Sequence, residues 1–365
     1  MNSRKSIVSA AEFAAALRKV SAVLRKSAFP VLEQVCVEFE GGVCRVKGTD
    51  LSVYMSAEIP AYGDRFSFVF KNTANIVRAC AHYTGELTVE LWESGGKTML
   101  NMCDSIRGGE FPFWEAEQYP AFPTMEPTEH YTAKADTLYE RVKRVRYASD
   151  SETSSNALSG IRFEGNHVWC IDGMRVALSD DEALNVDPRF IVPAKALEHL
   201  KTFGDCDLDI AVGKKYAMFS GNGLTLICRQ LETCDGMKVE NIFPKTVQES
   251  YFVDRAKYLD TLKYLGEFVR GRRSAFVHYE NGKLWLYDKN TACRYNAQVA
   301  AESKCEIPYT VDLKYMKEAL EQFAGEQFVR IDVNGGTSPL VLSADGPLKA
   351  LLMTARVPES VRNAA

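Results

Sequence analysis

The sequence lacks any apolar run that approaches the roughly 20 residues needed by a membrane-spanning helix. Its first residues, 1–6, contain no apolar core of a signal peptide. The 10 cysteines include no CxxC pair, and the 5 histidines are scattered singly, so no zinc site is indicated. Several cysteines fall inside apolar stretches, as reduced cysteines do. We therefore expect a cytoplasmic protein that has no metal site, no cofactor and no membrane contact.

Motifs of common enzymes are missing as well. The segment Ala157-Leu158-Ser159-Gly160 lacks the Gly-x-Ser-x-Gly frame of a nucleophile elbow. Ser220-Gly221-Asn222-Gly223 is typical of a hairpin turn and not of a phosphate-binding loop. Asp50, Asp172 and Asp288 recur at corresponding places, where a turn-forming role is the simpler interpretation than three equal active sites. These features argue against an enzyme.

A long internal repeat is the most informative feature that is present. Leu17, Leu138 and Leu259 are spaced by 121 residues, and strand-like runs begin at 87, 208 and 329 with the same interval. This period is far longer than the roughly 20–50 residues of a solenoid repeat and matches a small domain. The 365 residues therefore predict three copies of one domain, at 1–125, 126–246 and 247–365.

Each copy shows the same pattern of elements. An initial strand is followed by an amphipathic helix, and then by strands whose apolar residues alternate, as at Val35, Val37 and Phe39. A second helix follows, which we predict at 72–83, at 193–203 with Pro193 in its first turn, and at 312–323. The predicted class is α+β, with antiparallel sheets and two helices per domain on one face of the sheets. Such a triplication suggests an arc or a ring.

Positive charge is distributed unevenly along the chain. The net charge is −4, so gross charge does not indicate a nucleic-acid binder. Cations nevertheless recur near both predicted helices of every copy, which suggests a basic helix-lined surface that would hold phosphates without reading sequence. Glu140, Asp260 and Glu267 reduce the net positive charge of these helices, and a solvated helix face is the simpler alternative. The candidate DNA-binding residues are Arg25, Lys26, Lys71, Arg78, Arg141, Arg144, Lys195, Lys201, Lys263 and Lys314.

Several ordered motifs carry a resemblance to a known family. They run collinearly from about residue 6 to 357 and comprise the segments 24–32, Gly48-Thr49-Asp50-Leu51, 158–164, Ile171-Asp172-Gly173-Met174-Arg175-Val176-Ala177, Ile191-Val192-Pro193-Ala194-Lys195-Ala196-Leu197 and Leu351-Leu352-Met353-Thr354-Ala355-Arg356-Val357. In order and spacing they resemble the bacterial sliding clamp, the β subunit of DNA polymerase III.

The resemblance implies an architecture and partners. Two chains of three domains would close head to tail into a ring around double-stranded DNA, with helices inside and sheets outside. As a processivity factor, the protein would tether the replicative DNA polymerase and would be loaded by a clamp loader. The family's DNA-contacting basic position after the first helix falls on Lys26 or on its neighbour Arg25.

The resemblance also implies a peptide-binding pocket and a dimer interface. The pocket would lie between the second and third copies and bind short peptides of the Gln-x-x-Leu-Phe kind; its matching residues are Leu158, Ile171, Gly173, Met174, Arg175, Val176, Pro244, Leu351, Leu352, Met353 and Arg356. Core packing is the alternative for each position taken alone. For the homodimer we expect Leu100 and Met102 on an edge strand of copy one to meet Phe268 and Val269 of copy three.

Some residues depart from the family pattern. Met174 replaces a His, Thr354 and Ala355 replace Pro and Met, and Glu152 stands where a DNA-contacting Gln is usual. The extension 358–365 passes the usual end of the chain and is expected to border the pocket as a lid. The alternative function is a triplicated protein-interaction scaffold that does not encircle DNA.

Overall fold

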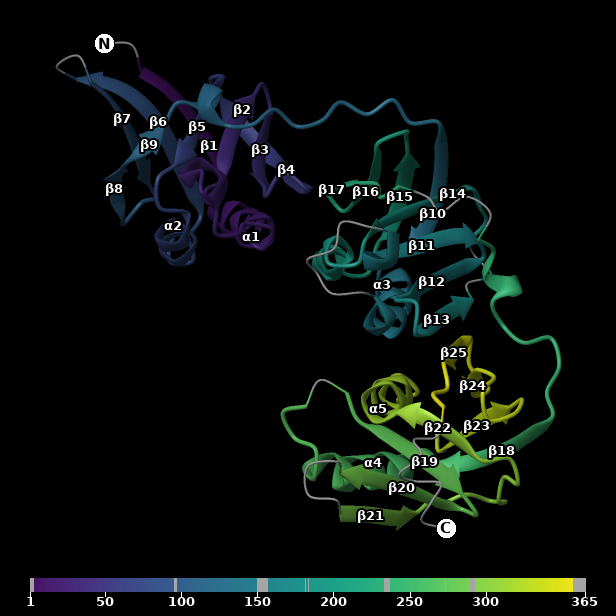
Figure 1. The fold of residues 1–365 in the computed structure, drawn as a ribbon. Helices are drawn as coiled ribbons and strands as arrows, with labels where there is room; N and C mark the ends of the chain where they lie inside the picture. The colour runs from purple at the N-terminus through teal and green to yellow at the C-terminus, as the bar shows by residue number, and fades with distance from the viewer. Residues whose placement is uncertain are drawn as a thin grey trace. The chain divides into compact units, whose positions relative to one another are not determined.

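The three copies have the same order of elements in the computed structural model, which describes residues 3–94, 97–149, 157–180, 182, 184–232, 237–272, 274–288 and 293–356. Copy one contains β1 (Ser3–Ser9), α1 (Ala10–Ser21), η1 (Pro30–Glu33), β2 (Cys36–Glu40), β3 (Val43–Thr49), β4 (Val53–Gly63), β5 (Phe66–Phe70), α2 (Thr73–Cys80), β6 (Glu86–Ser94), β7 (Lys97–Cys103), β8 (Gly108–Phe111), β9 (Phe113–Trp114) and η2 (Ala116–Gln118). The η elements are 3₁₀ helices (Figure 1).

Copy two repeats this order, with one helix replaced. It contains β10 (Glu129–Lys134), α3 (Ala135–Val145), η3 (Arg146–Ala148), η4 (Ala157–Ser159), β11 (Gly160–Gly165), β12 (His167–Ile171), β13 (Arg175–Asp180), β14 (Val186–Pro193), η5 (Ala196–Phe203), β15 (Asp207–Val212), β16 (Tyr216–Gly221), β17 (Leu224–Arg229) and η6 (Val239–Asn241). The predicted second helix is therefore a 3₁₀ helix, and Pro193 ends a strand instead of starting a helix. β14 is the terminal strand of its sheet, where proline is tolerated because it cannot donate a hydrogen bond.

Copy three contains β18 (Glu249–Asp254), α4 (Arg255–Glu267), β19 (Phe276–Glu280), β20 (Lys283–Asp288), β21 (Cys293–Gln298), β22 (Tyr309–Asp312), α5 (Leu313–Gln322), β23 (Phe328–Val333), β24 (Leu340–Ser343) and β25 (Leu348–Leu352). Asp254 and Asp312 cap α4 and α5 by accepting hydrogen bonds from backbone N–H groups in the first turn. The repeated leucines Leu17, Leu138 and Leu259 lie in α1, α3 and α4 and are all buried. The predicted triplication is confirmed.

Contacts group the chain into two compact units. Unit 1 comprises Met1–Tyr139 and Ala196–Gln230, and unit 2 comprises Glu140–Lys195 and Leu231–Ala365. The division passes through copy two, so the three domain boundaries that we derived from the repeat stay a prediction. Unit 1 holds one large sheet, ordered β10-β15-β16-β17-β4-β1-β6-β7-β8 along its main path; unit 2 holds the sheets β14-β11-β12-β13-β25-β24-β23-β18 and β21-β20-β19-β22.

The sheets are antiparallel, and helices cover one face of them. Within copy one α1 packs against α2, and within copy three α4 packs against α5 (Figure 1). The alternation of apolar residues along β2 and β3 buries Val37, Phe39, Cys44 and Val46 on a single face. The hairpin turn predicted at Ser220-Gly221-Asn222-Gly223 forms, with Asn222 and Gly223 both in the left-handed region, as tight two-residue turns require.

Candidate functional site

Two segments that lie far apart in the sequence meet in unit 2 as neighbouring strands. β13 pairs with β25, and this ladder places Val176 opposite Leu351 and Leu178 opposite Lys349. At the end of the ladder the N–H of Met353 donates to the carbonyl of Met174 over 2.9 Å. The segments 171–176 and 351–356, which we predicted to share one pocket, therefore lie side by side.

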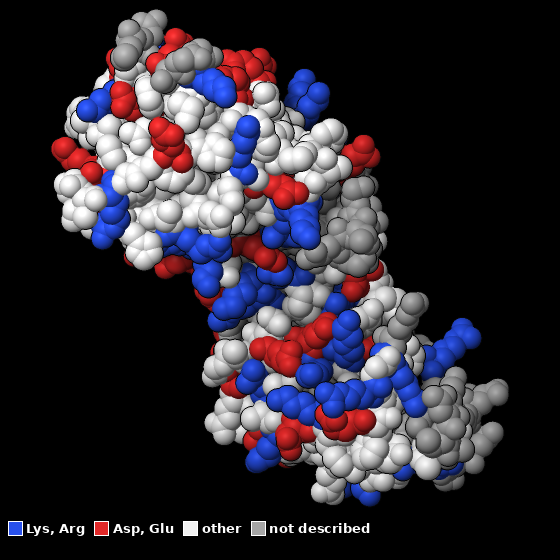
Figure 2. Space-filling view, turned by 90° about the vertical axis from the view of Figure 1, so that its left-hand side faces the viewer, with Lys and Arg blue, Asp and Glu red and all other residues white. Residues whose placement is uncertain are grey.

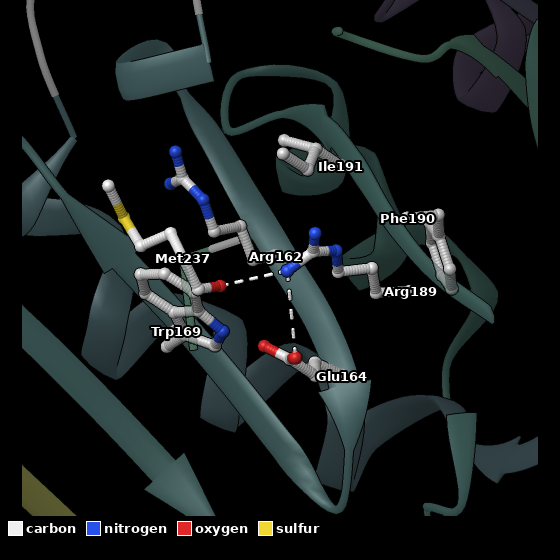
Figure 3. A pocket seen from close by; sticks show the side chains of 7 residues that line it. All are labelled: Arg162, Glu164, Trp169, Arg189, Phe190, Ile191 and Met237. Carbon is white, nitrogen blue, oxygen red and sulfur yellow. Dashed lines mark hydrogen bonds and ion pairs between the residues drawn. The ribbon is translucent and has the colours of Figure 1, made fainter. Parts of the chain in front are cut away.

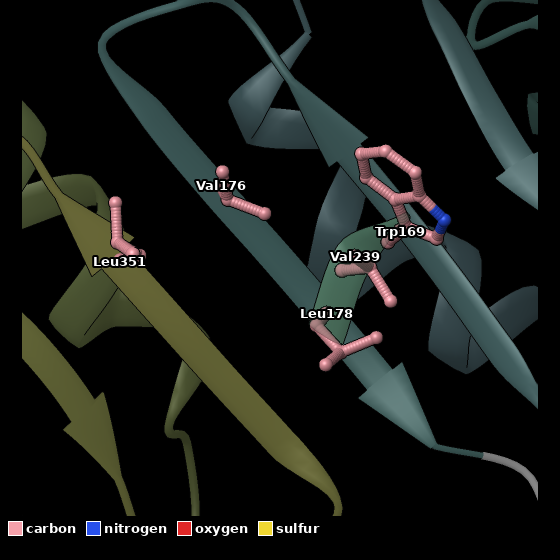
Figure 4. Close-up of a cluster of buried hydrophobic side chains, with 5 residues drawn as sticks. All are labelled: Trp169, Val176, Leu178, Val239 and Leu351. Carbon is pink, nitrogen blue, oxygen red and sulfur yellow. The ribbon is translucent and has the colours of Figure 1, made fainter. Parts of the chain in front are cut away.

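The outward side chains of this strand pair form an apolar floor, which Figure 4 shows from close by. Val176, Leu178 and Leu351 are buried together with Trp169 from β12 and Val239 from η6. Ile171, Met237, Ile242, Phe243 and Val341 pack against this cluster and are only partly buried. The floor thus combines strands of copies two and three with the segment that links them.

A cavity of about 310 Å³ adjoins this floor. Its apolar lining consists of Leu178, Val239, Phe243, Pro244, Val247 and Val341, and its polar lining of His167, Asp180, Glu240, Asp332, Asn334 and Lys349. A cavity of this size and mixed lining is typical of a binding site for a small ligand or for a few side chains of a peptide. We call the floor and this cavity the groove.

Sequence reasoning found only part of the groove. Of the predicted pocket residues, Pro244 lines the cavity, and Val176, Ile171 and Leu351 belong to the floor. Leu178, Val239, Phe243, Val247 and Val341 were missed. Period-two alternation from Val176 would have indicated Leu178 on the same face. Val341 becomes a neighbour only through the β24–β25 pairing, which no local pattern reveals.

Four other predicted pocket residues lie beyond the Arg175–Leu352 end of the β13–β25 ladder, and we call this end the lip of the groove. Met174 and Met353 are 47% and 38% exposed, so these flexible side chains stand free at the end of the ladder. Arg356 is exposed, and Gly173 has a φ of 90°, which explains a glycine in this turn. Leu158 is half-buried in η4 and is not among the described side chains of the floor or the cavity.

Arg175 and Leu352 face away from the groove. They are paired with each other across β13 and β25, so alternation places them on the opposite face from Val176 and Leu351. Both are buried, Arg175 at 6% exposure. Our expectation that Arg175 and Leu352 line the peptide-binding pocket is therefore corrected: both side chains lie on the opposite face, and Arg175 supports the groove from behind.

The Arg175 guanidinium holds a network that joins copies two and three. Its Nε donates to Asp172 over 2.9 Å, its Nη1 is bonded to Glu318 of α5, and its Cζ lies 4.4 Å from the Tyr315 ring centroid and 5.2 Å from that of Tyr147. Burial opposes the charge of the guanidinium, but the hydrogen bond to Glu318 and the charges of Asp172 and Glu318 outweigh it and raise the Arg175 pKa.

A second, much smaller cavity lies beside Trp169, as Figure 3 shows. The Arg162 guanidinium lies 4.7 Å from the Trp169 ring centroid, and Arg189 donates to the carbonyl of Met237 over 2.8 Å and approaches Glu164. The space of about 10 Å³ is enough for one water at most. We interpret these arginines as a support for Trp169 and Met237 at the groove.

Most of the candidate DNA-binding residues are exposed. In the view of Figure 2, Lys and Arg side chains lie on the surface of the molecule with Asp and Glu side chains between them. The exposed candidates are Arg25, Lys26, Lys71, Arg78, Lys195, Lys201, Lys263 and Lys314. Lys314 approaches Glu318 at 3.8 Å, and Arg144 is half-buried. Arg25 and Lys26 follow the end of α1 in an irregular segment.

One candidate cation, Arg141, is directed elsewhere. Its Nη1 donates to the hydroxyl of Ser179 over 3.2 Å and to the carbonyl of Asp180, at the end of β13. Arg25, in contrast, lies near η5 in unit 1: burial lowers the pKa of His199, and the charge of Arg25 lowers it further. Arg25 of copy one thus lies near His199 of copy two within unit 1, whereas Arg141 connects α3 to the end of β13. Glu152 and residues 358–365 lie outside the described residues.

The predicted dimer residues need correction. Leu100 and Met102 are fully buried, and β7 pairs with β6 on one side and with β8 on the other, so β7 is not an edge strand. Val269 is 8% exposed and belongs to the core. Only Phe268 is partly accessible, stacked on Tyr295 of β21 with 3.6 Å between ring centroids. Substituting Leu100 with Asp would therefore disrupt the fold instead of separating a dimer.

Comparison with known proteins identifies the class of the fold. The chain superposes on a DNA polymerase sliding clamp from Caulobacter crescentus with a TM-score of 0.84 at 18% identity, over 97% of this chain and 100% of that one. It superposes on a sliding clamp from Pseudomonas aeruginosa, bound to griselimycin, with a TM-score of 0.81 at 16% identity, over 98% and 100%. The fold is that of a DNA clamp, built from three copies of one unit.

The sequence comparison agrees with the fold. The chain is 23% identical over 349 residues to the beta sliding clamp of Synechococcus elongatus, covering 88% of this chain and 90% of that protein. No protein-family model matches the sequence. The chain therefore has the fold of a DNA clamp and is distantly similar in sequence to a bacterial beta sliding clamp.

The described residues contain neither a membrane-spanning helix nor a metal-binding cluster. No helix in these parts of the chain is long and apolar enough to cross a membrane. No group of three or more His, Cys, Asp or Glu side chains in the same residues is arranged to hold a metal ion.

Proposed function

We propose that this protein is a DNA polymerase processivity factor, a sliding clamp that encircles duplex DNA and tethers replication proteins. The observation that carries the proposal is the likeness to a beta sliding clamp over 88% of the chain, together with the three copies of one unit. This role requires binding and closure but no catalysis, and it would be carried out in the cytoplasm.

The exposed cations support the DNA-binding part of the proposal. Arg25, Lys26, Lys71, Arg78 and Lys201 lie in unit 1 on or beside helical elements, and Lys263 and Lys314 lie on α4 and α5. Long cationic side chains on helices contact phosphates without distinguishing bases, as a protein that slides along DNA requires. Carboxylates between them keep the contacts weak enough for movement.

The groove supports the tethering part of the proposal. Its buried floor, its open cavity and the two exposed methionines at its lip suit a short peptide with apolar anchors, such as one of the Gln-x-x-Leu-Phe kind. We propose that such a peptide belongs to a polymerase or to a clamp-loader subunit. The Caulobacter crescentus clamp, which shares the fold at 18% identity, has been solved with polyethylene glycol bound to its putative beta-motif tethering region.

Loading on circular DNA tests the proposed function. A clamp that has been placed on a nicked circle should stay bound at a salt concentration that abolishes direct phosphate contacts, because its retention is topological. Cutting the circle should release it. Equal retention on linear and circular DNA at high salt would favour the interaction scaffold instead. Lys26→Glu combined with Arg144→Glu should slow loading, whereas Lys97→Glu, an exposed change in β7, should not.

A further inference from the structure

A chain of ion pairs and hydrogen bonds in unit 2 connects an exposed lysine of α5 with the lip of the groove. The Nζ of Lys314 lies 3.8 Å from Oε1 of Glu318, and Oε2 of Glu318 is bonded to Nη1 of Arg175. On its other side, Arg175 donates from Nε to Oδ2 of Asp172 over 2.9 Å. The remaining oxygen of Asp172 accepts the backbone N–H of Met174, which lies at the lip, over 2.9 Å.

We propose that Glu318 positions the lip of the groove through Arg175, and that a phosphate bound at Lys314 strengthens peptide binding by leaving Glu318 to Arg175 alone. This proposal rests on the proposed function, because it requires DNA at α5 and a peptide in the groove. Its consequence is that the protein binds its peptide partners more tightly on DNA than in free solution.

The turn at the lip does not itself require the arginine, as the other junction between copies shows. There Asp50 accepts the backbone N–H groups of Ser52 and Val53 over 3.0 and 2.8 Å, just as Asp172 accepts those of the residues two and three positions on. Val53 begins β4 and pairs with β17, as Arg175 begins β13 and pairs with β25. Because Val53 is buried and uncharged, the same turn forms without a cation. The Arg175 network is thus an addition at the junction that carries the groove.

The Glu318 carboxylate is shared between two cations in different surroundings. The side chain of Arg175 is 7% exposed and that of Lys314 is 62% exposed, with Glu318 between them at 28%. The Arg175 end is therefore largely shielded from water, where a charged hydrogen bond is strong, whereas the Lys314 end is open to solvent and to phosphates. When a phosphate pairs with Lys314, Glu318 loses one of its two cations, and its charge acts on Arg175 alone.

A stronger bond between Glu318 and Arg175 holds the lip more firmly. Arg175 fixes Asp172, and Asp172 fixes the backbone N–H of Met174. The carbonyl of Met174 in turn accepts the N–H of Met353, the second exposed methionine of the lip, over 2.9 Å. A lip that is already ordered loses less conformational entropy when a peptide binds, so the peptide binds more tightly.

The same helix supplies a matched control. Lys317 lies 3.9 Å from Glu321, in the same i,i+4 arrangement and at nearly the same distance as Lys314 from Glu318. Within the described chain, however, the Glu321 carboxylate has no contact with Arg175. Replacing Lys317 therefore removes the same charge from α5 and leaves the connection to the lip intact.

Isothermal titration calorimetry of a Gln-x-x-Leu-Phe peptide in the absence of DNA tests the connection. We expect Lys314→Ala to tighten binding by about two- to fivefold, the range for a surface ion pair, because it leaves Glu318 to Arg175 as a phosphate would. Lys317→Ala should leave the affinity unchanged. Glu318→Gln should weaken binding by roughly threefold or more, because its amide carries no charge to hold Arg175. In the Glu318→Gln background, Lys314→Ala should have no further effect, whereas a merely structural role of Glu318 would leave that effect in place.

The same titration at a saturating concentration of a short DNA duplex tests the effect of phosphate. The wild type and Lys317→Ala should bind the peptide about two- to fivefold more tightly with the duplex than without it, and Lys314→Ala should not respond. If the duplex binds but leaves the wild-type peptide affinity unchanged, or if Lys314→Ala responds like the wild type, the coupling is overturned and the proposed function stands. A wild type that fails to bind the peptide or the duplex contradicts the proposed function, and the coupling with it.

Discussion

Arg175→Ala is expected to lower the free energy of unfolding of unit 2 by about 3–5 kcal/mol, the range for removing one partner of a buried ion pair. The guanidinium bonds Asp172 and Glu318 and packs against the rings of Tyr315 and Tyr147. Without it, Asp172, whose side chain is 9% exposed, keeps its charge without this partner. Urea unfolding gives the free energy, and hydrogen exchange of the β13 and β25 amides shows whether the loss is centred on the groove.

Two variants serve as controls for this prediction. Arg356→Ala removes an exposed arginine from the same unit and should change stability by less than about 0.5 kcal/mol. Arg175→Lys keeps the positive charge but loses the planar fork and the stacking on the tyrosine rings. Its loss of unfolding free energy should therefore lie between the losses of Arg356→Ala and Arg175→Ala. An Arg175→Ala protein as stable as the wild type would show that the network does not hold copies two and three together.

Met353→Asp is expected to weaken the binding of a Gln-x-x-Leu-Phe peptide by about 1–4 kcal/mol, or roughly 5- to 1000-fold. The side chain is 38% exposed at the lip of the groove, so a carboxylate there would meet the apolar anchors of the peptide without burying charge in the core. Isothermal titration calorimetry measures the change.

The matched control is Phe252→Asp. Phe252 is 42% exposed in the same unit, but it belongs neither to the floor nor to the cavity lining of the groove. The Phe252→Asp variant should leave the affinity for the peptide unchanged. If Met353→Asp binds the peptide as tightly as the wild type does, the peptide does not use this groove.

The sequence alone predicted the repeat and its elements, because the period of 121 residues and the alternation within the strands can be read directly from the sequence. The turn at Asn222-Gly223 followed from composition for the same reason. The 3₁₀ form of η5 did not, since Pro193 can begin a helix or end a terminal strand, and only the β11–β14 pairing decides between them.

For the site, the family resemblance correctly placed the segments 171–176 and 351–356 together, but it did not show which face each side chain takes. The pairing of Arg175 with Leu352 turns both away from the groove, and the burial of Leu100 and Met102 moves the free edge from β7 to β8. These outcomes depend on strand partners that are distant in the sequence.

The most direct test of the ring is a measurement of native mass combined with electron microscopy of single particles of the full chain, which requires neither a loader nor a polymerase. The proposal predicts particles of two chains, each of 40.8 kDa, that form a closed ring with a central hole wide enough for duplex DNA. Particles of one chain at every concentration, or open filaments of many chains, would contradict it.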